Sequence, residues 1–300
     1  MENQIFANLD KSLSVDMRDI RNQFQNIIKG VFEDFFADKD GFDIKRNFRS
    51  YFYDEYEIGT FVNEHDVGTL YVEIRQPKDY NPTYKLKDQI IINPNYNLDK
   101  IKTSIYNILI AKCDKSTLIW QSKYAIYLRF VENISHEGEG GKTKVDQNIY
   151  DFKLVIGLSY KNEDNLYGIR YYAKNRVDVQ TKYINHALNN IAFKNMETHN
   201  LYTQYVNLFK KIVLCNPKVN NVGFELIEMI LYNLPNSLFA KNINMIAIRN
   251  IINYLRNNSV LNYKTLDEQH IAFVSDNTEY SVMDLKETIK NFELFYKKNA

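Results

Sequence analysis

An aspartate within a strongly apolar segment is the first residue whose placement could serve chemistry. Between residues 148 and 160, apolar residues recur at every second position, and they are Tyr150, Phe152, Leu154, Ile156 and Leu158. This two-residue period predicts a strand with one apolar face and places Asp151 on the opposite face. Aspartate is depleted in strands, so its presence needs a reason. Asp151 is therefore either a functional carboxylate on the open face or a solvent-facing residue near a strand end.

A lysine in the second half of the chain has a setting that also suits chemistry. Lys210 follows Leu208 and Phe209, which belong to an apolar stripe with helical spacing. A lysine in this position can pack its methylene stem along the stripe and keep its ammonium in a polar opening. We therefore expect the ammonium of Lys210 to point into a cleft.

Three other patterns that could indicate a functional site lack residues that such a site requires. Segment 138–143 is glycine-rich, but a phosphate loop needs a glycine five positions before Gly141, where His136 stands, and a strand rather than a helix is predicted next. The five histidines are scattered, without the i, i+4 pair of a zinc-binding helix. Cys113 and Cys215 lie in no glycine-rich elbow, and we interpret them as ordinary core or surface thiols.

The elements that must position these residues change type along the chain. Helical spacing over residues 13–36 predicts a long amphipathic helix at the start. A mainly antiparallel sheet is predicted next, with residues 136–147 as a hairpin connection and with strands at 67–75, 123–131, 149–160 and 166–173. Beyond about residue 180 the helical period returns, and it predicts helices at 201–213, 224–234, 243–255 and 282–296.

Composition limits the classes of function. The chain has 300 residues, of which 45% are hydrophobic and 25% charged, so it can bury a large core. A net charge of +1 does not indicate nucleic-acid binding by bulk charge, although it leaves a local basic groove open. Without a run of about 18 apolar residues and with a polar N-terminus, we expect no membrane span or signal peptide. Two cysteines favour a reducing, cytoplasmic setting.

Taken in order, these segments resemble the nucleotidyltransferase superfamily, in the branch of the oligoadenylate and cyclic-oligonucleotide synthases. Residues 56–62, with Gly59 and Thr60, are similar to the turn and helix that hold the nucleotide, and Asp66 matches the first aspartate of the first catalytic strand. Residues 148–156 are similar to the strand that bears the third aspartate, here Asp151. The resemblance implies an α+β fold: a nucleotidyltransferase-like mixed sheet lobe at 1–178, packed against a C-terminal helical lobe at 179–300.

The resemblance also implies the chemistry of nucleotide transfer. Enzymes of this family hold two magnesium ions, one to activate the attacking hydroxyl and one to neutralise the leaving pyrophosphate. The implied metal ligands and catalytic residues are Asp66 and Asp151, and a shifted Glu-x-Asp register adds Glu64. Gly59, Thr60 and Lys210 are the implied nucleotide-binding residues, with Lys210 on the triphosphate.

Several positions depart from the family pattern. Asp54-Glu55 stands where a Gly-Ser turn should cradle the triphosphate, which places two negative charges there. Gly68 replaces the second aspartate and so removes a metal ligand. Residues 223–228 are similar to the family's next helix, but the serine that normally precedes its glutamate is absent; Glu228 itself lies on the inward stripe, where we expect it to have a structural partner.

These departures lead to three hypotheses. The first is a nucleotidyltransferase-fold protein with an eroded active site and no cofactor, which acts as a nucleotide-binding or scaffolding subunit beside a protein partner or homologous subunit. The second is an active, divergent nucleotidyltransferase that uses magnesium with Glu64, Asp66 and Asp151 to make an oligonucleotide or cyclic nucleotide from nucleoside triphosphates. The third is a pure protein-interaction module.

Overall fold

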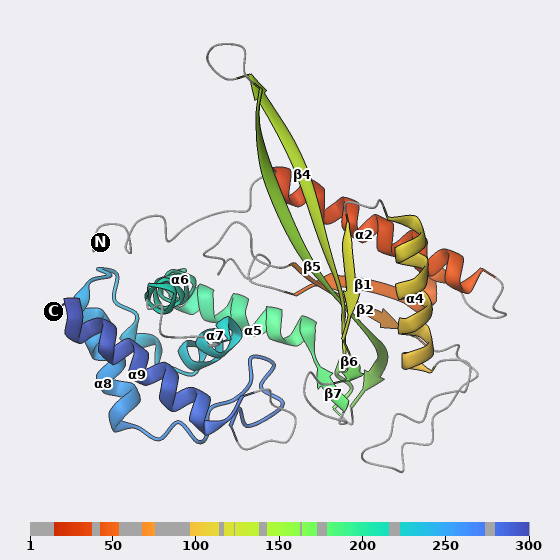
Figure 1. Ribbon diagram of the computed structural model, residues 1–300. Coiled ribbons are helices and arrows are strands. Elements are labelled where there is room, and N and C mark those ends of the chain that lie inside the picture. The colour runs from red at the N-terminus through yellow and green to blue at the C-terminus, as the bar shows by residue number, and fades with distance from the viewer. Residues whose placement is uncertain are drawn as a thin grey trace. The chain divides into compact units, whose positions relative to one another are not determined.

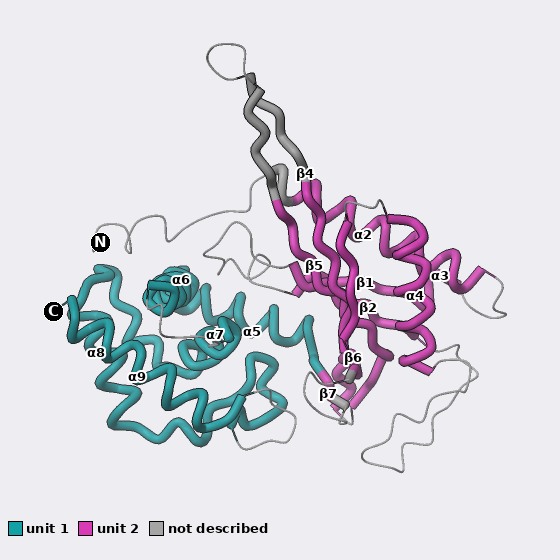
Figure 2. Tube along the Cα trace, in the orientation of Figure 1, with its two compact units in different colours: residues 1–12, 55–62, 182–300 teal, residues 13–54, 63–181 magenta. Residues whose placement is uncertain are grey.

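The computed structural model describes two compact units, which are shown in different colours in Figure 2. The described residues up to Thr181 form the first, here called the sheet unit, and those from Lys182 onward form the second, the helical unit. The described residues are 15–37, 43–53, 68–75, 97–113, 117–122, 124–137, 143–162, 164–172, 179–215, 223–273 and 280–299; within them, side chains are not described at 15–17, 132–137, 143–148, 172 and 179.

The sheet unit is built on a mixed seven-stranded sheet. Its strands are β1 (Phe48–Phe52), β2 (Gly68–Ile74), β3 (Leu118–Gln121), β4 (Ile126–Glu137), β5 (Thr143–Lys161), β6 (Tyr167–Tyr172) and β7 (Val179–Lys182). The order is β1-β2-β5-β4-β3, and β6 pairs with both β5 and β7. β2 and β5 run parallel, whereas the β1–β2, β3–β4, β4–β5 and β5–β6 pairs are antiparallel. The α+β class with a mixed sheet is thus confirmed.

Two helices cover one face of this sheet. They are α2 (Val15–Phe36) and α4 (Leu98–Lys112), which lie on the same side in Figure 1, and a short α3 (Ile44–Asn47) leads into β1. The buried core joins Phe24 and Phe32 of α2 to Ile105 of α4 and to the strands through Leu70 and Leu154. The helix predicted over 13–36 is confirmed, whereas α4 is not among the predicted elements.

The β4–β5 hairpin is longer than the sequence indicates. The strands stay paired from Ile126↔Leu154 as far as Glu137↔Thr143, so most of the predicted connection at 136–147 is strand. The strand expected after the glycine-rich segment is present, because β5 begins at Thr143. This confirms that the segment does not lead into the helix that a phosphate loop requires.

The helical unit contains the helices expected from the returning helical period. They are α5 (Ile184–Glu197), α6 (Leu201–Leu214), α7 (Phe224–Tyr232), α8 (Met245–Asn257) and α9 (Val282–Asn299), with a 3-10 turn at Asn236–Leu238. Most residues of α6 are buried. Its Phe209 ring packs edge-on against the Phe292 ring of α9, with the ring centroids 4.5 Å apart. α5 was not predicted. Over the described ranges, no helix combines the length and apolar character needed to cross a membrane.

Candidate nucleotide site

The two faces of β5 differ as the sequence period predicts. Phe152, Leu154, Ile156 and Leu158 are buried in the core beneath α2 and α4. Asp151 lies on the opposite face, and its side chain is 21% exposed. β5 also lies beside β2, the strand that directly follows Asp66, and Gly68 is the Cα partner of Phe152. The strand that carries Asp151 is therefore central and adjacent to the strand expected to carry the other carboxylates.

An arginine that the sequence did not single out holds Asp151. Arg129 of β4 is the Cα partner of Asp151 across the antiparallel pair. Its Nε donates to Oδ1 at 2.6 Å and its Nη2 donates to Oδ2 at 2.7 Å, a two-pronged contact that occupies both carboxylate oxygens. The hydrogen bonds and charge of Asp151 raise the pKa of Arg129 above its usual value. The carboxylate is thus paired with a guanidinium group whose side chain is 41% exposed.

A side chain at position 68, where the family has its second aspartate, would point away from Asp151. A Cβ built on Gly68 would come within 3.0 Å of the Phe152 ring and 3.5 Å of the Phe52 ring. Both rings belong to the apolar side of the sheet. An aspartate at position 68 of this backbone would therefore enter the core and could not share a metal ion with Asp151.

A second carboxylate on the face of Asp151 belongs to a separate cluster. Glu73 of β2 is 5% exposed; its carboxylate accepts a hydrogen bond from the Tyr51 hydroxyl and one from Arg75 Nε at 3.0 Å. Burial, together with the hydrogen bond to Glu73 and its charge, raises the pKa of Tyr51 to about 12. Glu73 pairs with Gly157, six residues beyond Asp151, which corresponds to about 20 Å along the strand. It cannot act as a third ligand beside Asp151.

Aromatic side chains lie beside Asp151 toward the edge of the sheet. Trp120 of β3 stacks on Tyr127 of β4, with ring centroids 5.2 Å apart and planes 7° from parallel. The hydroxyl groups of Tyr124 and Tyr127 are hydrogen-bonded, and Lys153 Nζ lies 5.0 Å from the Tyr124 ring centroid. Because Tyr127 is the Cα partner of Lys153, this group shares the face of Asp151.

Lys210 has a different setting from the expected one. Its side chain is fully buried, and its Nζ donates to Glu228 Oε1 of α7 at 2.6 Å, with Glu228 4% exposed. The expectation that Glu228 has a structural partner is confirmed. The ammonium is enclosed by the protein and does not lie at a polar opening, because the carboxylate of the neighbouring helix satisfies its charge. Its role in nucleotide binding stays a prediction.

Side chains at the end of α5 and in its connection to α6 organise the start of α6. Thr198 Oγ1 accepts a hydrogen bond from Tyr202 N at 3.1 Å, and Asn195 Oδ1 accepts one from Thr203 N at the same distance. The Tyr202 hydroxyl donates to the backbone carbonyl of Glu228 at 3.1 Å. The first two bonds hold the start of α6 to the end of α5, and the Tyr202 bond joins α6 to α7, as the Lys210–Glu228 pair also does.

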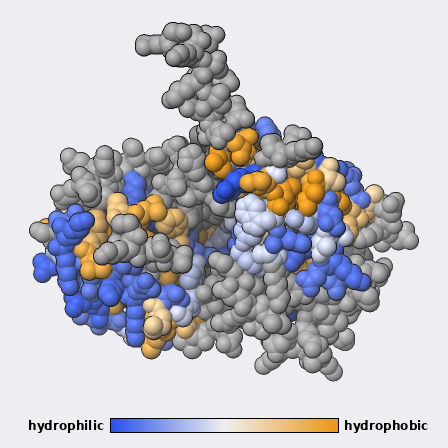
Figure 3. Space-filling view, in the orientation of Figure 1, coloured by the Kyte–Doolittle hydropathy of each residue, from blue (hydrophilic) through white to orange (hydrophobic). Residues whose placement is uncertain are grey.

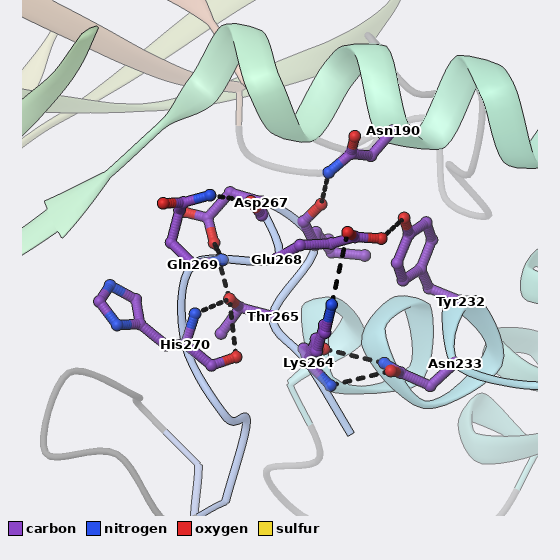
Figure 4. A network of polar contacts seen from close by, with 10 residues as sticks. Asn190, Tyr232, Asn233, Lys264, Thr265, Asp267, Glu268, Gln269 and His270 are labelled. Atoms are coloured by element: carbon purple, nitrogen blue, oxygen red, sulfur yellow. Dashed lines mark hydrogen bonds and ion pairs between the residues drawn. The ribbon is translucent and has the colours of Figure 1, made fainter. Parts of the chain in front are cut away.

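A second polar network of the helical unit holds a connecting segment in place (Figure 4). The segment after α8 is tied to α7 through Asn233, whose side chain bonds the backbone of Lys264 twice at 2.8 Å. Asp267, 6% exposed, accepts from Thr265 Oγ1 at 2.6 Å and from the backbone N of Tyr183 at 3.3 Å. These bonds anchor a long connection and saturate the buried carboxylate, as buried charge requires.

The remaining predicted site residues lie outside the described part of the chain. They are Gly59, Thr60, Glu64 and Asp66, together with the Asp54-Glu55 pair. Among the residues that the structure describes, no three His, Cys, Asp or Glu side chains gather in a group that could hold a metal ion. Within that part of the chain, Asp151 is a potential oxygen ligand for magnesium, and both of its carboxylate oxygens contact Arg129.

Comparisons with known proteins identify the fold. No family model and no curated protein sequence matches the chain. Among solved structures, the Rhodothermus marinus CdnE c-UMP-AMP synthase with Apcpp and Upnpp is similar over 99% of this chain and 97% of its own, at 13% identity and a TM-score of 0.70.

Two further solved structures have the same architecture. The Elizabethkingia meningoseptica CdnE cyclic dinucleotide synthase with GTP and Apcpp is similar over 97% of each chain, at 15% identity and a TM-score of 0.64. The E. coli CdnC in its complex with HORMA-deltaN is similar over 97% of this chain and 86% of its own, at 13% identity and a TM-score of 0.54. The chain therefore has the same fold as these three synthase structures, an α+β fold with a mixed sheet, as its sequence resemblance implied.

Proposed function

We propose that this chain is a nucleotidyltransferase-fold protein with an eroded active site, which acts by binding, as a nucleotide-binding or partner subunit, and not by joining nucleotides. The observation that carries the proposal is the two-pronged contact of Arg129 with both carboxylate oxygens of Asp151. In a two-metal site this carboxylate has to coordinate a cation, and here a guanidinium already supplies the positive charge.

The neighbouring strand strengthens this argument. Gly68 contributes no oxygen ligand. A side chain at position 68 would point toward the Phe152 ring, so β2 cannot present a carboxylate to Asp151 from that position. A second metal ion would then depend on Glu64 and Asp66 together with an Asp151 that must first leave Arg129. Two-metal catalysis loses most of its rate when ligands that act on the transition state are missing.

The similar structures support binding as the retained property. The two CdnE structures contain nucleotide or nucleotide analogues, and the CdnC structure is a complex with another protein. We infer that a nucleoside triphosphate is the ligand of this chain and that a protein or homologous subunit is its partner. The Trp120–Tyr127 stack beside Asp151 offers a planar surface of the kind on which nucleobases stack.

Calorimetric titration of ATP and GTP with magnesium and with EDTA tests the proposal. We expect nucleotide affinities that differ by less than about threefold between the two conditions, because Arg129 occupies both oxygens of Asp151 and Gly68 contributes no ligand to couple magnesium to the triphosphate. The matched variants are Asp151→Asn and Asp99→Asn, the latter an exposed aspartate of α4 in the same unit. A tenfold or larger tightening by magnesium that Asp151→Asn abolishes and Asp99→Asn retains would support the active alternative instead.

A further inference from the structure

The sheet unit contains a cavity of about 670 Å³ on the side opposite Asp151. It lies between α2, the end of α4 and the apolar face of β4 and β5. On the face of the molecule seen in Figure 3, hydrophobic residues gather on the sheet unit close to β4. The residues that matter most to the argument are Phe24, Ile27, Gly30, Phe130, Tyr150 and Phe152.

The floor of the cavity is aromatic. Phe24 and Phe152 stack with ring centroids 4.3 Å apart and planes at 20°. Phe130 meets both rings edge-on, at 6.2 Å from Phe24 and 5.9 Å from Phe152. Phe24 and Phe152 are only 2% and 3% exposed, so the rings that can meet a ligand are those of the half-buried Phe130 and Tyr150. An aromatic ring packed against them gains about 0.5–1.5 kcal/mol beyond simple burial.

One wall of the cavity is a second stripe of α2. The stripe that enters the core includes Ile28 and Phe32, whereas the cavity stripe passes through Ile20, Ile27 and Gly30. Ile27 is 42% exposed although it is a large aliphatic residue, and a Cβ built on Gly30 would meet no atom within 4 Å. Ten residues of helix span about 15 Å, so this wall is as long as a drug-sized molecule.

The size of the cavity selects the ligand class. Small-molecule sites measure about 300–1,000 Å³ and are mostly apolar with a few polar groups. The polar side chains that line this cavity include Gln23, Asn26 and Thr117.

We propose that this cavity binds a small, planar aromatic molecule. Tyr150 and Phe152 flank Asp151 on β5 but point to the other side of the strand, so this site and the candidate nucleotide site lie on opposite faces of one sheet. The proposal rests on the geometry of the sheet unit alone and does not depend on nucleotide binding.

A fluorescence titration with 1-anilinonaphthalene-8-sulfonate, a planar two-part aromatic probe, tests the proposal on the full chain. The Cβ of Gly30→Met would meet no atom within 4 Å, and methionine favours a helix over glycine, so the protein should stay folded. Asn22→Met, at an exposed position of the same helix outside the lining, is the matched control. We expect saturable binding to wild type, a tenfold or greater loss of affinity in Gly30→Met, and less than a twofold change in Asn22→Met.

A second measurement locates the probe. Cys113 lines the cavity and is partly exposed, so in a Cys215→Ser background its alkylation by iodoacetamide reports occupancy. We expect saturating probe to slow the alkylation of Cys113 at least fivefold. Absence of saturable binding, equal affinities of wild type and Gly30→Met, or unchanged alkylation would each overturn the proposal.

Discussion

Removal of the carboxylate of Glu228 should strongly destabilise the helical unit. The Lys210 side chain is 0% exposed and that of Glu228 is 4% exposed, with their charged atoms 2.6 Å apart. In Glu228→Met the ammonium loses its counter-charge but stays in a desolvated interior. Breaking one side of a buried ion pair in this way costs about 3–5 kcal/mol of unfolding free energy.

The double variant Lys210→Met/Glu228→Met separates the penalty for an unpaired charge from the loss of packing. Both side chains become apolar and similar in volume to those they replace, so most of the lost stability should return and the double variant should unfold within about 1–2 kcal/mol of wild type. The control is Arg256→Gln, which breaks the Arg256–Glu293 pair of the same unit; because Arg256 is 59% exposed, we expect a loss below about 1 kcal/mol.

Urea denaturation followed by far-ultraviolet circular dichroism measures these free energies. Because the protein has two compact units, the transition that Glu228→Met shifts is the one assigned to the helical unit. If Glu228→Met loses less than about 1 kcal/mol, or if the double variant is no more stable than the single one, the account of Lys210 as a buried structural cation is wrong.

Three further predictions concern the sheet unit. Gly68→Asp should cost about 3 kcal/mol in a urea titration and add no magnesium binding by calorimetry, because its side chain would meet the Phe152 ring. Gly157→Ala should cost about 1–3 kcal/mol, since its Cβ would lie 2.4 Å from a carbonyl oxygen of β6. The pKa of Tyr51 is raised to about 12, so stability from its bond to Glu73 should be intact below pH 10 and fall as the pH rises toward 12, a loss that Tyr51→Phe should lack in pH-dependent unfolding.

Local patterns predicted the elements with long, regular stripes. The strand with Phe152 and Leu154 on one face and Asp151 on the other, and the helix that contains Leu208, have the faces that their periods indicate. α4 has an equally readable signal, with Asn97 capping its start and Leu98, Ile101, Ile105 and Leu109 at helical spacing. It lies in a region where Asn and Lys residues stand between the apolar positions and weaken the helical stripe.

The partners of the site residues could not be predicted in the same way. Arg129 meets Asp151 only because the β4–β5 hairpin pairs in one register over a long ribbon, and a shift of one residue would move the arginine to the other face. Lys210 and Glu228 are 18 residues apart on two helices, so their contact depends on how α6 and α7 pack. A lysine beside an apolar stripe is compatible with both a cleft and an ion pair, and only tertiary structure decides between them.

The central claim is tested most directly by a search for product. The purified protein is incubated with radiolabelled ATP, GTP, CTP and UTP together, with magnesium or manganese, and the reaction is resolved by thin-layer chromatography after phosphatase treatment. We expect no phosphatase-resistant nucleotide product, because Asp151 is held by Arg129 and position 68 offers no ligand. If a product forms, and if Asp66→Ala and Asp151→Ala each abolish its formation, the eroded-site account is wrong and the protein is an active nucleotidyltransferase.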